Sequence, residues 1–446
     1  MSDADVVVIG SGQGGVPFAA DLAGAGRKVV LFERRTLGGS CINYGCTPSK
    51  AFLAAAHNAG RARQAAQLGI HVQVQVDFPA VMERVRSIRS TFNAGIERRL
   101  ADAGVQVIYA EASFTDAHTL SGGGTTVSAP LIVLNTGTSP LLPDIPGLAG
   151  MPVLTNENFF DLKTLPECTL VLGGGYIGLE LGQGLARLGS EVHILHRGER
   201  LLDHEEPDVG DVLAEAFRQD GMHLHLNATV ERAAYTDGVY TLTLKGGLEV
   251  QGTALLIATG RKPNTHALNV SAADIRLDAQ GYIAVDEHFQ TTVPGVYAIG
   301  DVARQPAFTH VSWEDYRRLK GILNGESRTR ADRVLGYATY TEPQVGRVGL
   351  TFEQAHEYKA RVVTLPMGQI ARAIEWGHTL GFYRLVVDED TDKILGATLV
   401  GYEAAELVHV LLAHMQAGST WRVLEQSVHI HPTYGEALPS LARLLT

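Results

Sequence analysis

Apolar and polar positions over the first 33 residues predict a strand, a glycine-rich turn, a helix and a second strand. The β-branched run VVVI at 6–9 is typical of a buried strand, and it leads directly into Gly10, Gly12 and Gly15. A helical pattern follows through Leu22, and KVVLFE at 28–33 is a second apolar run. This order predicts a βαβ unit with parallel strands.

The glycines and one acidic residue of this unit have the spacing of a dinucleotide site. Gly10 allows a tight turn, Gly12 lets the backbone approach a pyrophosphate at the helix N-terminus, and Gly15 lets the helix pack on the strand. Glu33 lies 23 residues after Gly10 and can accept hydrogen bonds from both ribose hydroxyls. The alternative is a tightly packed turn that binds nothing.

The same unit recurs at 169–197, where Gly173, Gly175 and Gly178 again separate an apolar strand from a helical pattern. The position equivalent to Glu33 is now His196, and Arg197 follows it. A carboxylate there suits a free ribose diol, whereas His and Arg offer charge-assisted donors to a 2′-phosphate. We therefore expect one flavin dinucleotide site and one nicotinamide site that prefers NADPH to NADH. Arg200 could add a further contact to the phosphate. The alternative is that these basic residues are only solvated side chains at the end of a strand.

Charge and hydropathy exclude some classes of partner. The chain has 37 Lys+Arg against 48 Asp+Glu, a net charge of -11, which argues against a nucleic-acid or anionic-membrane surface. The start, MSDADVVVIG, has acidic residues where a secretory signal has basic ones. No stretch approaches the roughly 20 apolar residues of a membrane span. We expect a soluble, cytoplasmic protein.

The chain has three cysteines, and two of them, Cys41 and Cys46, lie five positions apart. A chain of 446 residues buries large cores without disulfides, so a structural staple is disfavoured. Zinc normally takes four ligands, and no second closely spaced pair exists, so we expect no metal site here. Residues 47–49 open an alanine-rich helical pattern, whose N-terminus would stabilise a Cys46 thiolate and suits a redox pair. Cys168 begins a strand and is interpreted as core.

Six motifs together resemble the pyridine nucleotide-disulfide oxidoreductases, the group containing glutathione reductase, dihydrolipoamide dehydrogenase and mercuric reductase. They are the first glycine motif, GGSCINYGCTPSK, GGGYIGLE, ATGRKPN, VYAIGD and HIHPTYGE. The resemblance implies an α/β fold with two Rossmann-like domains, for FAD and NAD(P)H, and a C-terminal α+β dimerisation domain. The implied boundaries are 1–149 and 265–329 for the FAD domain, 150–264 for the NAD(P)H domain and 330–446 for the dimer interface.

The resemblance also implies the cofactor-binding residues. Those expected at FAD are Gly10, Gly12, Gly14, Gly15, Glu33, Arg34, Ser40, Lys50, Ala112, Thr136, Gly137, Asp301 and Thr309. Those expected at NADPH are Gly173, Gly175, Tyr176, Ile177, Gly178, His196, Arg197 and Gly260. Asp301 would contact the ribityl chain, and Tyr176 would be an aromatic lid over the flavin.

The catalytic roles are likewise implied by the family. Cys46 would contact the flavin and Cys41 would exchange with the acceptor. Lys50 and Glu180 would form an ion pair beside the flavin N5. His431, oriented by Glu436 five residues later, would move the proton at Cys41 from the other subunit of a homodimer.

The electron acceptor is the least determined feature. Lipoamide dehydrogenases usually carry an acid at the position of His196, and mercuric reductases carry a C-terminal cysteine pair, whereas this chain has no cysteine after Cys168. The stretch PAFTHVSWEDYRRLKGIL at 306–323 resembles the reactive-chlorine-resistance branch, linked to reduction of hypothiocyanous acid and cupric ion. We expect a small disulfide, oxidant or metal ion as acceptor. A redox-sensing flavoprotein without turnover is the alternative from another class.

Overall fold

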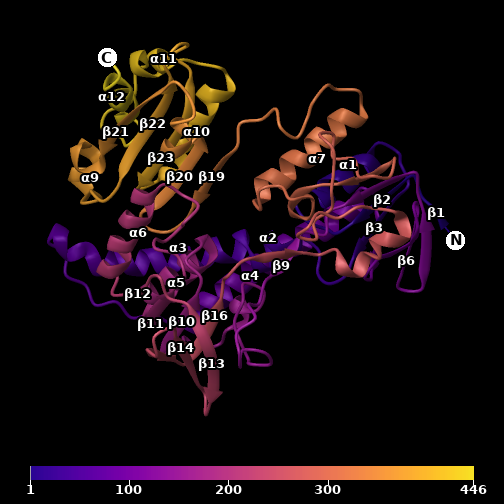
Figure 1. Ribbon diagram of the computed structural model, residues 1–446, viewed down its shortest axis with the longest axis horizontal. Helices are drawn as coiled ribbons and strands as arrows, with labels where there is room; N and C mark the ends of the chain where they lie inside the picture. The colour runs from indigo at the N-terminus through magenta and orange to yellow at the C-terminus, as the bar shows by residue number, and fades with distance from the viewer. Residues whose placement is uncertain (1) are drawn as a thin grey trace.

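The structure is a computed structural model that describes residues 2–446. Figure 1 shows two α/β lobes built from the first three quarters of the chain and a third lobe that contains the C-terminus. The first lobe contains a five-stranded parallel sheet in the order β18-β8-β2-β3-β4. Its strands are β2 (Val6–Ile9), β3 (Val29–Glu33), β4 (Gln106–Tyr109), β8 (Leu131–Leu134) and β18 (Val296–Ala298).

The second lobe repeats this plan. Its parallel sheet has the order β12-β11-β10-β16, which corresponds strand for strand to β4-β3-β2-β8. The strands are β10 (Cys168–Leu172), β11 (Glu191–Leu195), β12 (His223–His225) and β16 (Ala254–Ile257). Two Rossmann-like units, predicted from the recurring glycine pattern, are confirmed.

Each parallel sheet is accompanied by a small antiparallel sheet. In the first lobe this sheet contains β5 (Ser113–Asp116), β6 (Thr119–Gly122) and β7 (Thr125–Ser128), with β1 (Ser2–Asp3) parallel to β7. In the second it contains β13 (Val230–Thr236), β14 (Val239–Leu244) and β15 (Glu249–Gly252). The antiparallel pair β9 (Thr138–Pro140) and β17 (Arg261–Pro263) joins the two lobes.

Helices α1 to α7 belong to these two lobes. Near the first sheet lie α1 (Gly15–Gly24), α2 (Gly39–Tyr44), α4 (Phe78–Asp102) and α7 (Thr309–Leu323). The second lobe contributes α5 (Tyr176–Leu188) and α6 (Pro207–Gln219). The helix α3 (Cys46–Gln64) bridges the lobes because its Phe52 packs closely on Gly184 of α5, where a Cβ atom would lie 2.3 Å from the ring.

The third lobe is α+β, as predicted. Its antiparallel sheet has the order β19-β20-β23-β22-β21. The strands are β19 (Gly336–Thr339), β20 (Gln344–Gly349), β21 (Ala360–Pro366), β22 (Phe382–Asp388) and β23 (Ile394–Gly401). The helices are α8 (Phe352–Ala355), α9 (Ala371–Trp376), α10 (Ala404–Gln416), α11 (Trp421–Gln426) and α12 (Ala437–Arg443). Across residues 2–446, no helix has both the length and the apolar character needed to cross a membrane.

Candidate active site

A cavity of about 1140 Å³ opens at the carboxyl ends of the first parallel sheet and extends to the starts of α3 and α5. Carboxyl ends of parallel strands are where α/β folds bind nucleotides, and this volume exceeds the roughly 300–1,000 Å³ of ordinary small-molecule sites. It therefore has room for a large ligand. The residues expected at FAD that line it are Gly10, Gly12, Glu33, Arg34, Ser40, Lys50, Ala112, Thr136, Gly137, Asp301 and Thr309.

Gly14 and Gly15 serve the packing of the first glycine loop and do not line the cavity. A Cβ on Gly15 would lie 2.1 Å from the carbonyl oxygen of Gly10, and one on Gly10 would lie 2.4 Å from that of Asn135. Gly10 also has a φ of +97°, which favours glycine. The loop therefore needs glycine at these positions to pass so close to the end of β8.

Asn135, which sequence reasoning missed, fixes this loop from the end of β8. Its Oδ1 accepts a hydrogen bond from the backbone N–H of Gly15 at 2.9 Å, and its Nδ2 donates to the carbonyl of Ile299 at 3.0 Å. It thus joins the start of α1 to the segment before Asp301. The only signal in the sequence was its place at a strand end before Thr136-Gly137.

Glu33 lies at the end of β3 and is buried. Its Oε2 accepts from the N–H of Ser11 at 3.0 Å and from the Ser11 hydroxyl at 2.6 Å, while Oε1 accepts from the N–H of Arg35 at 2.9 Å. A carboxylate has about four acceptor positions, so these bonds leave capacity for about one further donor. Glu33 therefore shapes the loop as well as facing the cavity. Its neighbour Arg34 pairs with Glu111 at 3.4 Å.

Asp301 lies in a short 3-10 turn, Gly300–Ala303, after β18. Burial raises the pKa of its carboxyl, and Arg261 and a hydrogen bond from Thr138 at 2.8 Å oppose that rise. The turn itself is held by Asp315, whose Oδ2 accepts from the N–H of Gly300 at 2.8 Å. Asp315 in turn pairs with Arg333 at 2.6 Å, and sequence reasoning missed both residues.

The hydroxyl of Thr136 is a further sign that this cavity is built for a polar ligand. The Oγ1 atom is buried and has no hydrogen-bond partner, and Thr136 lines the cavity beside Gly137. Buried hydroxyls are normally paired, so a polar group is expected to reach it.

The two cysteines meet at a junction of helices. Cys41 lies in α2, Gly45 separates the helices, and Cys46 is the first residue of α3. Both line the cavity, and both are free thiols. The predicted position of Cys46 at a helix N-terminus is confirmed.

The surroundings of the two cysteines shift their thiol pKa values in opposite directions. A hydrogen bond from Cys41 lowers the pKa of Cys46 to about 6, aided by Thr309, whose Oγ1 lies 3.0 Å from the sulfur, and by Lys50; burial opposes this. The pKa of Cys41 is raised by the same bond and by burial. Cys46 is therefore the thiolate and Cys41 the thiol in the reduced protein near neutral pH.

Lys50 and Glu180 form an ion pair at the cavity wall. The Lys50 Nζ lies 2.6 Å from the Glu180 Oε2, and Nζ also lies 4.4 Å from the ring centroid of Tyr340. Glu180 accepts a second bond from the N–H of Tyr340 at 2.9 Å. The pair joins α3 to α5 one turn beyond Cys46, so a positive charge lies close to the redox thiols.

The second glycine loop is built like the first. A Cβ on Gly173 would lie 2.3 Å from the carbonyl of Ala258, and one on Gly178 would lie 2.4 Å from that of Gly173. Gly175 has open space around it, as a backbone that a phosphate approaches requires. Gly260 follows β16 and has a φ of +137°.

Tyr176 and Ile177 stand at the start of α5 and line the same cavity as the cysteines. The Tyr176 ring lies 5.7 Å from that of Phe308, and burial raises its pKa to about 12. Tyr176 therefore lines the cavity from the start of α5, and its role as a lid over the flavin stays a prediction.

His196 differs from its expected role as a free phosphate ligand. It is only 7% exposed, its Nδ1 accepts from the N–H of Gly174 at 3.2 Å, and its Nε2 lies 3.4 Å from the Asp203 carboxylate. The ring is packed beneath the glycine loop because Gly174 and Gly198 leave room for it. Arg197 is exposed, and Arg200 pairs with Asp211 at 3.3 Å.

His431 and Glu436 form the expected pair, with Nδ1 and Oε2 2.8 Å apart. The His431 side chain is 74% exposed, and neither residue lines the cavity that contains the cysteines. Val428 and Ile430, just before His431 in the chain, are 100% and 80% exposed. One chain therefore does not bring His431 to Cys41.

Cys168 is not the plain core residue that the sequence indicated. It is half-buried at the start of β10, and its sulfur lies beside the side chains of Glu191 and His193. The thiol faces polar groups because the first residue of the strand lies beyond the apolar core.

Comparisons with known proteins place the chain in a family. The model for the pyridine nucleotide-disulphide oxidoreductase family matches residues 4–315, and the model for the dimerisation domain of that family matches 336–442. Among curated proteins, the mercuric reductase of Bacillus cereus is 32% identical over 98% of this chain and 70% of its own length. The probable pyridine nucleotide-disulfide oxidoreductase RclA of Escherichia coli is 33% identical over the full length of both.

Solved structures agree. The Cu(II) complex of the HOCl-induced flavoprotein disulfide reductase RclA from Escherichia coli superposes with a TM-score of 0.91 over 100% of both chains, at 32% identity. LpdA from Mycobacterium tuberculosis gives a TM-score of 0.90 at 26% identity. The chain belongs to the pyridine nucleotide-disulfide oxidoreductases, FAD-dependent enzymes that use NAD(P)H and carry a dimerisation domain.

Proposed function

We propose that this protein is an NADPH-oxidising homodimeric reductase that passes two electrons through a Cys41–Cys46 disulfide to a small disulfide or thiol oxidant. One observation carries the proposal. Two thiols at a helix junction open onto a large cavity, and their surroundings lower the pKa of Cys46 to about 6 while raising that of Cys41. A structural cysteine pair has no need of this asymmetry.

The cavity fits FAD by its volume, its tight glycine loop and the unpaired hydroxyl of Thr136. When bound, FAD supplies a two-electron relay between a nicotinamide and a disulfide. Gly12 would approach its pyrophosphate, Glu33 would accept from a ribose hydroxyl, and Asp301 would accept from the ribityl chain. Lys50, paired with Glu180, would hold positive charge beside the thiols.

The residues of the chain account for the thiol chemistry. Two electrons and one proton reduce the disulfide to a Cys46 thiolate and a Cys41 thiol. Deprotonated Cys41 attacks one sulfur of an acceptor disulfide, forms a mixed disulfide and expels a thiolate. Cys46 then attacks the Cys41 sulfur, which releases the second thiolate and restores the disulfide.

The departing thiolates need a proton donor, and we assign this to His431 of the second subunit. Its Nδ1 bonds to Glu436 at 2.8 Å, which leaves Nε2 free to exchange a proton at Cys41. The exposed Val428 and Ile430, which precede His431 in the chain, support a surface that a second chain covers. The active site would then be complete only in the dimer.

NADPH is the proposed reductant because of Arg197. The side chain is exposed just beyond β11, where it can pair with a 2′-phosphate. His196 would contribute indirectly, since its ring supports the backbone of Gly174. The lipoamide alternative, which normally uses NADH, is disfavoured by the same arginine.

The electron acceptor is proposed from the share of each relative's length that the chain matches, as well as from sequence identity. The chain matches RclA over the full length of both proteins, whereas it covers 70% of the Bacillus cereus mercuric reductase. Within residues 1–446 no cysteine follows Cys168, so these residues contain no cysteine pair of the kind that delivers mercuric ion. We favour hypothiocyanous acid, an oxidant of thiols, with cupric ion as the second candidate because RclA was solved as a Cu(II) complex.

The test is a panel of NADPH-oxidation assays with the flavin-loaded dimer. Small disulfides, lipoamide, hypothiocyanous acid, cupric ion and mercuric ion would each be supplied as acceptor. We expect turnover with hypothiocyanous acid and loss of that turnover in Cys41→Ser, a matched variant that keeps Cys46. A protein without turnover on any acceptor would favour the redox-sensing alternative, and preferred turnover of lipoamide or mercuric ion would overturn the assignment.

A further inference from the structure

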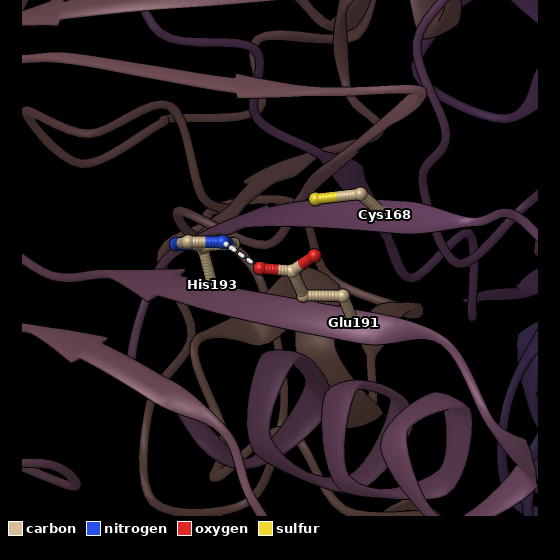
Figure 2. A group of neighbouring side chains, drawn as sticks. All are labelled: Cys168, Glu191 and His193. Atoms are coloured by element: carbon tan, nitrogen blue, oxygen red, sulfur yellow. Dashed lines mark hydrogen bonds and ion pairs between the residues drawn. The ribbon is translucent and has the colours of Figure 1, made fainter.

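A second group of chemically active side chains lies on the NAD(P)H-type lobe, apart from the redox cysteines. Figure 2 shows Cys168 on β10 facing Glu191 and His193 on the neighbouring β11, with His193 bonded to Glu191. One ligand atom from each of the three lies within 4.8 Å of the other two. His223 of β12 lies beside this group, with its Nε2 3.4 Å from the Glu191 Oε1.

Strand register explains why four residues from three strands share one face. Cys168 pairs with Glu191 across β10 and β11, and His193 pairs with His223 across β11 and β12. Alternate residues of a strand point the same way, so Glu191 and His193 lie on one face. These residues therefore lie together at the starts of three adjacent strands.

This position separates the cluster from the nucleotide site. Cys168 begins β10, and the glycine loop starts after its last residue, Leu172. Five residues of strand span about 16 Å at roughly 3.3 Å each. The cluster and the glycine loop therefore lie at opposite ends of the same sheet.

The distances suit a tetrahedral ion. Bonds of about 2.0–2.1 Å from nitrogen and oxygen to Zn²⁺, at tetrahedral angles, set neighbouring ligand atoms about 3.3 Å apart. The Glu191 Oε1 lies 3.1 Å from the His193 Nε2 and 3.4 Å from the His223 Nε2. The Glu191 carboxylate and the His193 imidazole are therefore spaced to share one ion, with His223 next to them.

The second ring nitrogen of His193 has a partner of its own. Its Nδ1 lies 3.0 Å from the Nε2 of His225, and the two rings stack at 5.3 Å. A histidine that binds a metal normally donates its other N–H to an acceptor that fixes the ring. His225 meets this requirement, so the Nε2 of His193 is directed at Glu191 and Cys168.

Exposure differs across the cluster in a way that admits an ion. The His193 side chain is 16% exposed, whereas Glu191 and His223 are 55% and 54% exposed. An ion can enter from solvent and be held against the inner histidine. The Cys168 thiol now donates weakly to the Gln251 carbonyl at 3.5 Å, a contact that it can give up.

The first Rossmann-like unit provides an internal comparison. By the glycine alignment, Cys168, Glu191 and His193 correspond to Asp5, Lys28 and Val30. By strand register, His223 corresponds to Gln106, since Val30 pairs with Gln106 as His193 pairs with His223. The fold therefore does not require this donor set, which belongs to the second copy alone.

We propose that this lobe contains a binding site for a divalent transition-metal ion of the zinc class, with ligands Cys168, Glu191 and His193 and a fourth position that is open to solvent beside His223. Thiolate, imidazole and carboxylate are the donors that Zn²⁺ takes in four-coordinate sites. Binding replaces the proton on the Cys168 sulfur, which leaves to solvent. The ion would tie together β10 and β11 and takes no part in electron transfer.

The test uses the flavin-loaded, full-length Cys41→Ser/Cys46→Ser protein, in which Cys168 is the only cysteine left. After removal of metal with a chelator, equilibrium dialysis against Zn²⁺ should give one ion per chain. Zn²⁺ should also slow maleimide labelling of Cys168 at least tenfold. Because the redox cysteines are absent, the outcome does not depend on their proposed function.

Variants within the same protein assign the ligands. Glu191→Gln, at a side chain that is 55% exposed, should weaken Zn²⁺ binding at least tenfold, as should His193→Gln. His225→Phe, which removes the orienting partner, should weaken it about 10–100-fold. The control is His288→Gln, at an exposed histidine of the other lobe, which should leave binding unchanged. Absence of stoichiometric Zn²⁺, unprotected Cys168, or binding unaffected by Glu191→Gln would overturn the site.

Discussion

The Sγ atom of Cys46 lies 3.0 Å from the Oγ1 of Thr309, although 263 residues separate them in the chain. Cys46 begins α3 and Thr309 begins α7, so two helix starts meet at one sulfur. The Thr309 hydroxyl joins Cys41 and Lys50 in lowering the pKa of Cys46. The redox thiol is therefore tuned by the long-range fold as well as by its own helix.

Thr309→Val should raise the pKa of Cys46. A hydrogen bond to a charged group contributes about 1.5–3 kcal/mol, which corresponds to a rise of about 1–2 pKa units. In the wild type the thiolate is present above a pKa of about 6 and is lost as the pH falls through it. The pH dependence of Cys46 alkylation in the reduced protein measures the shift, and Thr309→Ser is the control that keeps the hydroxyl.

Cys46→Ser should abolish the long-wavelength absorption expected when a thiolate lies against the flavin in the two-electron-reduced protein. Cys41→Ser should show that absorption before any reductant is added, because its Cys46 has no disulfide partner and is already a thiolate against oxidised flavin; two electrons would then reduce the flavin and remove the absorption. Anaerobic reductive titration followed by visible spectroscopy tests both variants. Absorption that survives in Cys46→Ser would reverse the roles assigned to the two cysteines.

His431→Ala should lower turnover about 10²–10⁴-fold, the usual contribution of a general acid–base group, while leaving flavin reduction by NADPH unchanged. Mixed dimers test whether the site crosses subunits. A dimer of one Cys41→Ser chain and one His431→Ala chain keeps one intact site only if each site uses both chains. Refolding equal amounts of the two should then restore about a quarter of wild-type activity. No restoration would mean that Cys41 and His431 act within one chain.

The sequence was sufficient for features set by local spacing. Both glycine loops, the paired parallel sheets and the position of Cys46 at a helix start follow from patterns within about 35 residues. Contacts between distant segments that no family motif marks were beyond its reach. Asn135 bonds to Gly15 across 120 residues, and no local pattern marks an asparagine for that task.

His196 shows a different limit. Alignment of the two units located its position correctly, yet alignment says nothing of the direction in which a ring packs. The space left by Gly174 and Gly198 draws the ring under the loop and away from solvent. The prediction that Cys168 lies in the core was wrong in the opposite direction. Its pattern is that of a buried strand, but the first residue of this strand lies at the polar end of the sheet.

Arg333→Ala should destabilise the protein and weaken its hold on FAD. The side chains of Asp315 and Arg333 are 0% and 4% exposed, and removing one partner of a buried pair costs about 3–5 kcal/mol. Asp315 also holds the turn that carries Asp301, so the effect should reach the flavin site. Denaturant unfolding and flavin retention on gel filtration measure the two effects. Arg317→Ala, on the exposed face of α7, is the control and should change neither.

Arg197→Ala should lower the preference for NADPH over NADH. Loss of a charge-assisted bond to the 2′-phosphate, about 1.5–3 kcal/mol, corresponds to a decrease of roughly 10- to 150-fold in kcat/KM for NADPH. NADH has no such phosphate, so its kcat/KM should stay the same. Arg200→Ala is the matched control, because Arg200 already pairs with Asp211 and should contribute less. An unchanged preference in Arg197→Ala would contradict the assignment, since His196 is packed under the loop and cannot replace the missing charge.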